Sequence, residues 1–221
     1  MMVNTVPNLP KQIFDTWVPA TWVEFVAASG DGEADKTRCY YDAGWMRIEA
    51  MGVGSGHSQD NTILSQVVSL YGIVKGLAVK GFTNGSFHRE GESECQPDMA
   101  FYLESDIPNP FPPKTTEIVD CDRYGAPTLV IEIASTSLND DLGRKRLLYE
   151  RLGIKEYWIV DVLGGVILAF GMENRGSREI QVSQVLPGLA MGMIEEALRR
   201  SRTENDTDVS RWLMQEFSEI A

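Results

Sequence analysis

Residues 128–134, Thr-Leu-Val-Ile-Glu-Ile-Ala, are the segment that most restricts how this chain can fold. Their β-branched and aliphatic side chains are typical of a central strand that is buried on both faces. A helix is predicted from about Asp140 to Leu152, and it ends at Gly153, a common helix-terminating residue. A second strand is predicted from Glu156 to Val162. This strand–helix–strand unit predicts an α/β fold.

The other hydrophobic segments are compatible with a mixed β-sheet flanked by helices. Apolar residues recur at helical intervals in several of them, and two short strands flank the turn Asp42-Ala43-Gly44. The additional helices are predicted at 19–28, from near His57 or Ser58, at 191–200 and at 209–220. Strands are predicted at 39–41, 45–48, 77–82, 97–103 and 165–170, and an insertion loop at 105–127.

Glu132 lies in the middle of the apolar strand, where an uncharged residue is expected. Burial of an ionised carboxylate costs several kcal/mol unless the group is paired, protonated or bound to a metal. Strand alternation places Glu132 on the same face as Val130 and Ala134. Either a structural ion pair or a functional site explains this carboxylate.

Lys145 lies on the inward stripe of the following helix, three residues after Leu142 and four before Tyr149. Side chains on a helix lean toward its N-terminus, so Lys145 is expected to point back toward the strand of Glu132. The alternative is a lysine whose stem is buried and whose ammonium group reaches water. Two opposite charges in one strand–helix unit favour a shared site.

Asp98 follows Pro97 at the start of another predicted strand. It is either a turn residue or a second carboxylate of the same site. Together, Asp98 and Glu132 offer two oxygen ligands to Mg²⁺ or Mn²⁺, which usually keep several waters and bind substrate phosphates. A nearby Lys145 would then orient or deprotonate the attacking water and stabilise the charge on the phosphate.

Several of these motifs resemble the Uma2 (DUF820) family of the PD-(D/E)XK superfamily. They are Pro97-Asp98, Leu129-Val-Ile-Glu132-Ile-Ala-Ser135, Asp141-Leu-Gly-Arg-Lys145-Arg-Leu-Leu-Tyr149 and Gly153-Ile-Lys-Glu-Tyr-Trp-Ile-Val-Asp161. The resemblance implies a restriction-endonuclease-like core at about 22–170, within a nuclease-like domain at 1–190. Residues 191–221 would form a C-terminal helical extension.

The resemblance also implies the roles of individual residues. The family's metal-binding aspartate and glutamate fall on Asp98 and Glu132, and its catalytic lysine falls on Lys145. Ala134 occupies the position where the superfamily usually has this lysine. His57 matches a histidine at the family's helix entry, where it contributes to the site or serves as a cap or packing residue. Many members have a glutamate before the hairpin turn, which this chain lacks.

The resemblance implies a metal-dependent DNA endonuclease that acts through a metal-activated water. A formal charge of −12 opposes a broad phosphate-binding surface. The alternative is therefore a catalytically weakened family member that binds nucleic acid or another partner. A Ser-His-Asp or Cys-His hydrolase is disfavoured, because neither Ser55-Gly-His57 nor Cys121 lies in a nucleophile-elbow pattern. Cutting two strands with one site per chain favours a homodimer, with Trp212 to Phe217 as one possible contact.

Targeting signals are not evident in the sequence. The N-terminus lacks a basic region followed by an apolar one, and no segment approaches the roughly 18 apolar residues of a membrane span. Three cysteines, Cys39, Cys95 and Cys121, lack the spacing of a zinc site. We therefore expect a cytoplasmic protein that contains no membrane segment and has reduced, mostly buried thiols.

Overall fold

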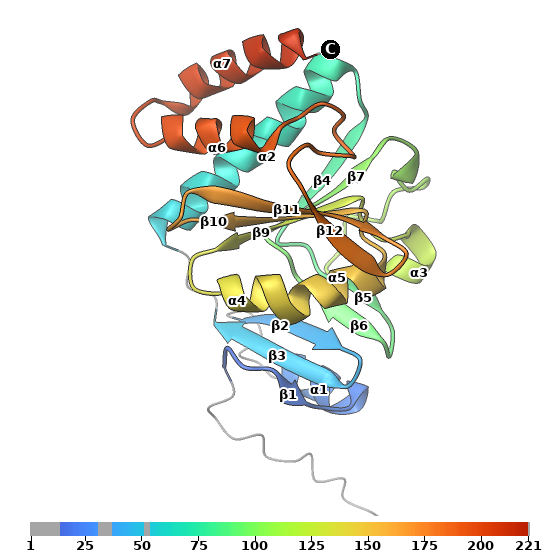
Figure 1. Cartoon of the computed structure of the whole chain (residues 1–221). Helices are drawn as coiled ribbons and strands as arrows, with labels where there is room; N and C mark the ends of the chain where they lie inside the picture. The colour runs from blue at the N-terminus through green and yellow to red at the C-terminus, as the bar shows by residue number, and fades with distance from the viewer. Residues whose placement is uncertain (1–13, 31–36, 51–53, 221) are drawn as a thin grey trace, which may run out of the picture.

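The computed structural model describes residues 14–30, 37–50 and 54–220. Within these ranges the strands form two sheets of six strands each. Figure 1 shows the layers: helices at the top, a central sheet, a helical segment, an N-terminal sheet and one short helix at the bottom. The top helices are α2 (Ser55–Lys75), α6 (Met191–Arg200) and α7 (Asp206–Glu219), and the bottom helix is α1 (Trp22–Ser29).

The central sheet contains the strand that was predicted from the apolar run. This strand, β9 (Leu129–Ala134), has all six residues buried and lies between a parallel and an antiparallel neighbour. The strand order is β12-β11-β10-β9-β7-β4. The other members are β4 (Val79–Thr83), β7 (Met99–Leu103), β10 (Glu156–Asp161), β11 (Val166–Glu173) and β12 (Gly176–Ile180).

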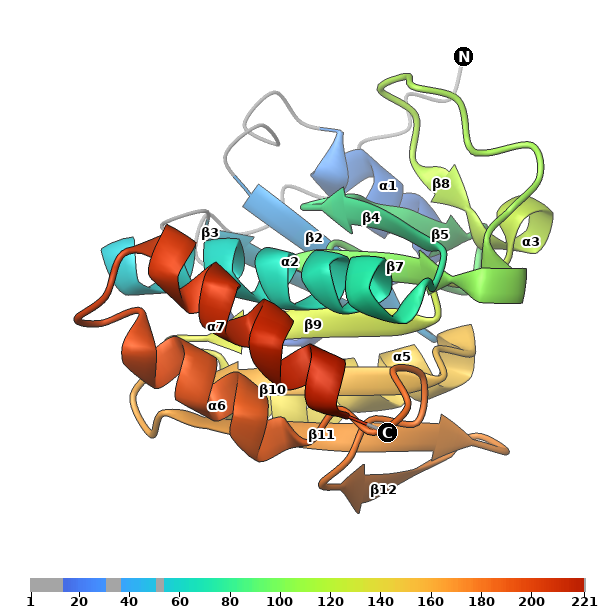
Figure 2. The same cartoon turned by 90° about the horizontal axis from the view of Figure 1, so that it is seen from above.

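Alternation along β9 separates two hydrophobic cores, as predicted. Leu129, Ile131 and Ile133 belong to the core beneath α2, α6 and α7, which lie across the sheet in Figure 2. Val130 and Ala134 belong to the core on the opposite face. Glu132 shares that second face, so its carboxylate lies between the central sheet and the layers below it.

The segment between β9 and β10 is not the single helix that was predicted. It consists of α4 (Leu138–Asp140), a π-helical turn (Asp141–Lys145) and α5 (Arg146–Leu152). Gly143 interrupts the helix with φ −95° and ψ −112°, a conformation outside the helical region. Gly153 ends α5 in the left-handed region with φ +89°, which confirms the predicted C-terminus.

The N-terminal sheet contains the predicted hairpin, β2 (Thr37–Asp42) and β3 (Trp45–Ala50). We expected one central sheet, but the hairpin forms a layer of its own. Tyr40 packs into the core below the central sheet, whereas Tyr41 packs against Phe25 of α1. Since both faces of β2 carry buried rings, the hairpin needs a cover on each side. The other strands are β1 (Val18–Pro19), β5 (Phe87–Arg89), β6 (Ser93–Cys95) and β8 (Val119–Asp120).

Short elements account for most other differences from the predicted structure. The predicted loop at 105–127 contains β8 and the one-turn helix α3 (Cys121–Tyr124). Four further strands, β1, β5, β6 and β12, were not predicted, because strands of two to five residues give little periodic signal. Helix α2 begins at Ser55, slightly before the predicted start.

The two C-terminal helices were predicted close to their observed positions. Leu213 and Phe217 of α7 are fully buried, and the ring of Phe217 lies 5.0 Å from that of Tyr71 in α2. These two side chains are therefore not available for contact with a second copy, whereas Met214 of the same segment is exposed, and the contact through this segment remains a prediction. The proposed boundary at residue 190 remains a prediction.

The three cysteines, Cys39, Cys95 and Cys121, are buried and unpaired, as predicted. Among the described residues, no helix combines the length and apolar character needed to cross a membrane.

Candidate active site

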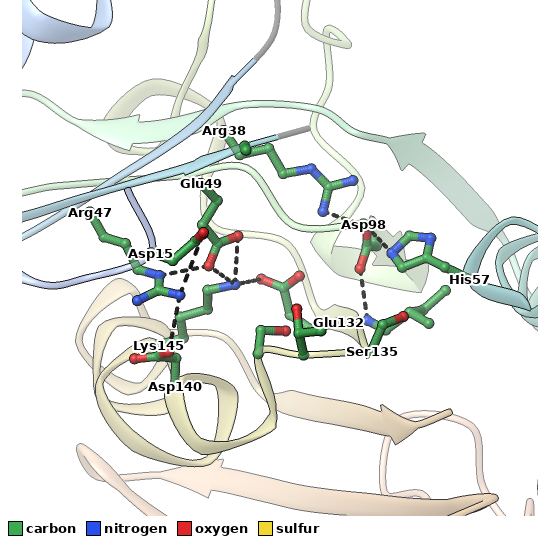
Figure 3. A pocket seen from close by; sticks show the side chains of 14 residues that line it. Asp15, Arg38, Arg47, Glu49, His57, Asp98, Glu132, Ser135, Asp140 and Lys145 are labelled. Carbon is green, nitrogen blue, oxygen red and sulfur yellow. Dashed lines mark hydrogen bonds and ion pairs between the residues drawn. The ribbon is translucent and has the colours of Figure 1, made fainter. Parts of the chain in front are cut away.

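A cavity of about 280 Å³ lies where the end of β9 meets the residue before β7, the N-terminal hairpin and the start of the following helical segment (Figure 3). It is rich in charge of both signs. Its charged or titratable lining residues are the acids Asp15, Glu49, Asp98, Glu132 and Asp140 and the basic residues Arg38, Arg47, His57 and Lys145.

Asp98 directly precedes β7 and is only 1% exposed. The backbone N–H of Ile133 in β9 donates to Asp98 Oδ2 at 2.7 Å, which fixes the carboxylate beside the neighbouring strand. Asp98 Oδ1 lies 2.5 Å from Arg38 Nη1 and 3.1 Å from His57 Nε2. Burial alone would raise the pKa of Asp98, but His57, Arg38 and the Ile133 N–H together hold it below its usual value. Asp98 is therefore ionised at neutral pH.

Glu132 is 2% exposed and faces two tyrosines. Its Oε1 accepts hydrogen bonds from Tyr149 Oη at 2.6 Å and from Tyr40 Oη at 3.3 Å. Burial raises the pKa of Glu132 to about 8, even though the nearby Lys145 acts in the opposite direction. Glu132 is therefore a carboxyl group that holds a proton near neutral pH until another positive charge arrives.

Lys145 is only 1% exposed, so its ammonium group does not reach bulk water. Its Nζ lies 2.9 Å from Glu49 Oε1, 3.0 Å from Asp141 Oδ1 and 3.7 Å from Glu132 Oε1. It also lies 4.3 Å from the ring centroid of Tyr40. Burial would lower the pKa of Lys145, but these carboxylates raise it well above its usual value. The predicted inward orientation is confirmed, and the alternative of a solvent-seeking lysine is wrong.

Lys145 and Asp141 both point inward from the segment that is kinked at Gly143. They lie four residues apart on the same turn, and both side chains are buried. Tyr157 Oη donates to the carbonyl of Asp141 at 3.3 Å, which ties the turn to β10.

Glu49 is a site carboxylate that sequence reasoning missed. It lies near the end of β3, close to Lys145, and Arg47 on the same strand donates to it at 2.7 Å. Burial opposes ionisation of Glu49, but Lys145 and Arg47 lower its pKa below the usual value. The hairpin thus supplies a carboxylate from the strand after its turn. The alternation of Arg47 and Glu49 was a signal, but it did not reveal what the strand would pack against.

Arg38 is the second missed residue. Its side chain lies in β2, on the same face as Tyr40, and bridges Asp98 to Asn84, whose Oδ1 accepts from Nη2 at 2.7 Å. Buried Asp98 and exposed Asn84 hold its guanidinium group at the edge of the cavity. A charged residue at the start of a strand is ordinarily exposed, so the sequence alone gave no reason to select it.

The structure brings together all four residues that were selected from the sequence. Asp98 contacts His57 directly, and Lys145 contacts Glu132 directly. Asp98 reaches the strand of Glu132 through the N–H of the adjacent Ile133. His57 lies in the first turn of α2 and points at Asp98, so it is more than a helix cap.

Asp98 and Glu132 fit a divalent cation of the magnesium type. Among the described residues, no group of three or more His, Cys, Asp or Glu side chains could hold a metal ion. Mg²⁺ is nonetheless commonly bound by one or two carboxylates that leave positions open to water and phosphate. Asp98 Oδ1 is buried without a well-directed hydrogen bond from the described residues, although two basic groups lie close to it. The two basic groups beside this oxygen occupy the place that a cation would take.

The Uma2 family model, described as "Putative restriction endonuclease", matches residues 22–204. The chain belongs to the Uma2 family. A crystal structure of a "putative nuclease belonging to DUF820" from Anabaena variabilis ATCC 29413 has a similar fold, with a TM-score of 0.51 and 20% sequence identity. The similarity covers 88% of this chain and 99% of that one. No curated protein matches the sequence. The predicted membership of the Uma2 family and the predicted fold class are both confirmed.

Proposed function

We propose that this Uma2 protein is a DNA endonuclease that depends on Mg²⁺ or Mn²⁺ bound by Asp98 and Glu132. The observation that carries the proposal is the burial of Lys145 beside Glu132, in a cavity that Asp98 also lines. Lysines are rarely buried unless they are paired. A buried ammonium group beside one candidate metal ligand, in a cavity that the other ligand also lines, matches the needs of phosphoryl chemistry. The family description supports the same reaction class.

The bound cation would supply Lewis-acid polarisation of the phosphate and a water of lowered pKa. Lys145 donates hydrogen bonds from a fixed ammonium group, which stabilises negative charge as it develops on the phosphate oxygens. Glu49 and Asp141 hold that ammonium in place and keep it protonated. Lys145 is thus an electrostatic and positioning group, because an amine with a raised pKa is a poor general base.

Tyr149 and Tyr40 position Glu132 through its Oε1, so Oε2 is the oxygen better placed for a ligand. Arg38 and His57 hold Asp98 ionised, and both of them lie beside its Oδ1. Because a cation on Asp98 would balance the charge of that carboxylate, Arg38 could instead pair with a substrate phosphate. Arginine suits this exchange, since its guanidinium group forms similar paired contacts with carboxylates and phosphates.

Cleavage assays on labelled single-stranded, duplex and branched DNA test the proposal. We expect cleavage with Mg²⁺ or Mn²⁺, none with EDTA and little with Ca²⁺, which orders and activates water less effectively. If the pure protein cuts no form of DNA with either ion but still binds DNA or another partner, the binding-module alternative replaces the nuclease. We also propose that the protein acts as a homodimer in the cytoplasm. Light scattering tests whether it is a dimer.

A further inference from the structure

A polar trough of about 500 Å³ adjoins the catalytic cavity. Arg38 and His57 line both hollows, so the trough opens directly beside Asp98. One wall is the exposed side of the first half of α2, and the other is the end of β4 with the turn that follows it. Its central lining residues are Asn61, Thr62, Ser65 and Gln66 from α2 and Thr83 and Asn84 from the opposite wall.

The trough differs sharply in charge from the rest of the molecule. The chain has a formal charge of −12, and five carboxylates line the neighbouring cavity. None of the described residues that line the trough is acidic, and all of them carry polar side chains. A polyanion therefore meets hydroxyl and amide groups there instead of carboxylates. Such neutral groups make many of the phosphate and sugar contacts in nucleic-acid complexes.

Several of these polar groups are free to bind a ligand. The side chains of Asn61, Ser65 and Thr83 form no hydrogen bond with any other described residue. Arg38 stands at the junction of the two hollows, between Asp98 and Asn84. A chain of phosphates that leaves the catalytic cavity past Arg38 would thus enter a surface with unused donors.

We propose that the trough binds one strand of the nucleic-acid substrate, on one side of the reacting phosphate, and that the enzyme prefers an accessible single strand to a duplex. This inference rests on the proposed function and assigns its substrate class. Of the cations that line the two hollows, Lys145 and Arg47 are engaged by carboxylates within the cavity. Arg38 is the one Lys or Arg among the described residues that line the trough, and it is itself paired with Asp98, so there is too little positive charge to hold both strands of a duplex.

Two isosteric substitutions on one turn of α2 test the trough. Asn61→Asp places a negative charge in it, whereas Gln59→Glu places the same charge on an exposed side chain that lines neither hollow. Fluorescence anisotropy with a labelled single-stranded oligonucleotide in Ca²⁺ gives the affinity without relying on cleavage. We expect Asn61→Asp to weaken binding about fivefold and Gln59→Glu less than about twofold.

Thr83→Asp, on the opposite wall, should weaken binding as Asn61→Asp does, and it serves if the first variant fails to fold. The salt dependence of wild-type affinity should be shallow, with a log–log slope of about −1, because one main cation contacts the strand. The matching duplex should bind more weakly than the single strand.

Equal weakening of binding by Asn61→Asp and Gln59→Glu would contradict the proposal that the trough binds a strand. A log–log salt slope steeper than about −4, or no binding of a single strand by the wild type, would contradict it as well. Because binding tests the trough and cleavage tests the nuclease activity, the failure of one proposal can be told from the failure of the other. If Asn61→Asp weakens binding selectively but the protein cleaves no DNA, the trough proposal is retained and the nuclease proposal is rejected. If the wild type cleaves DNA but Asn61→Asp and Gln59→Glu have the same affinity and KM, the nuclease proposal is retained and the trough proposal is rejected.

Discussion

Lys145 Nζ lies 3.7 Å from Glu132 Oε1, although the two residues belong to different elements and Lys145 is 1% exposed. The ammonium group is closer still to Glu49 and Asp141. One ammonium group therefore lies among three acidic side chains, and its own side chain is almost completely buried. Such a buried ion pair adds little to the free energy of folding, but it creates a strong electrostatic field in the cavity.

Replacement of Lys145 by methionine keeps the length of the side chain and removes its charge. Glu49, Glu132 and Asp141 then lack their shared partner, so the free energy of unfolding at about pH 8 should fall by about 3–5 kcal/mol. The loss should be smaller at about pH 5, where the acids are more easily protonated. Urea unfolding at both pH values measures the difference, and an equal loss at the two would argue against the shared ion pair.

Glu132→Gln tests the raised pKa of the buried acid. Burial raises the pKa of Glu132 to about 8, compared with about 4.3 for an unfolded chain. The folded state therefore binds this proton more tightly. Its stabilising effect is complete below about pH 4 and is lost as the pH rises through about 8. The variant has no such loss, so its stability relative to wild type should increase between about pH 5 and 8 and then level off. A constant difference in urea unfolding across this range would contradict the raised pKa.

Metal binding should release the same proton. Below about pH 8 the cation must displace it from Glu132, whereas Asp98 is already ionised. Apparent affinity for Mg²⁺ or Mn²⁺ should therefore rise by up to about tenfold per pH unit until about pH 8. Calorimetry in two buffers with different ionisation enthalpies should detect about one proton released near pH 6.5. No proton release would mean that Glu132 is not a ligand, or that it is ionised beforehand.

Glu49→Gln tests whether this carboxylate positions Lys145. The substitution preserves the shape of the side chain but weakens the hold on the ammonium group, which is then drawn toward Glu132 and Asp141. We expect kcat to fall by about tenfold to a hundredfold with little change in KM, since the contact matters most in the transition state. Asp15→Asn is the matched control, because Asp15 lines the same cavity with a largely exposed side chain. Equal effects of both variants would remove the positioning role.

The sequence was most informative where a charge broke an apolar pattern. Glu132 stands inside a buried strand and Lys145 on the inward stripe of a helix, so local periodicity alone selected them. Arg38 and Glu49 gave no comparable signal, because their burial depends on the hairpin packing against the central sheet. The formation of a second sheet is a long-range effect of covering both faces of β2. The break at Gly143 was missed because a lone glycine does not normally end a helix pattern.

Calorimetric titration of Mg²⁺ and Mn²⁺ into the wild type and into Asp98→Ala, Glu132→Ala and Lys145→Ala, combined with DNA cleavage by the same samples, tests the central claim most directly. We predict that the wild type binds the cation and cleaves DNA, and that the two carboxylate variants lose both properties. Lys145→Ala should retain much of the cation binding and lose cleavage, because Lys145 is not a ligand. Unchanged cation binding in Asp98→Ala and Glu132→Ala, or cleavage that survives all three substitutions, would contradict the proposed site.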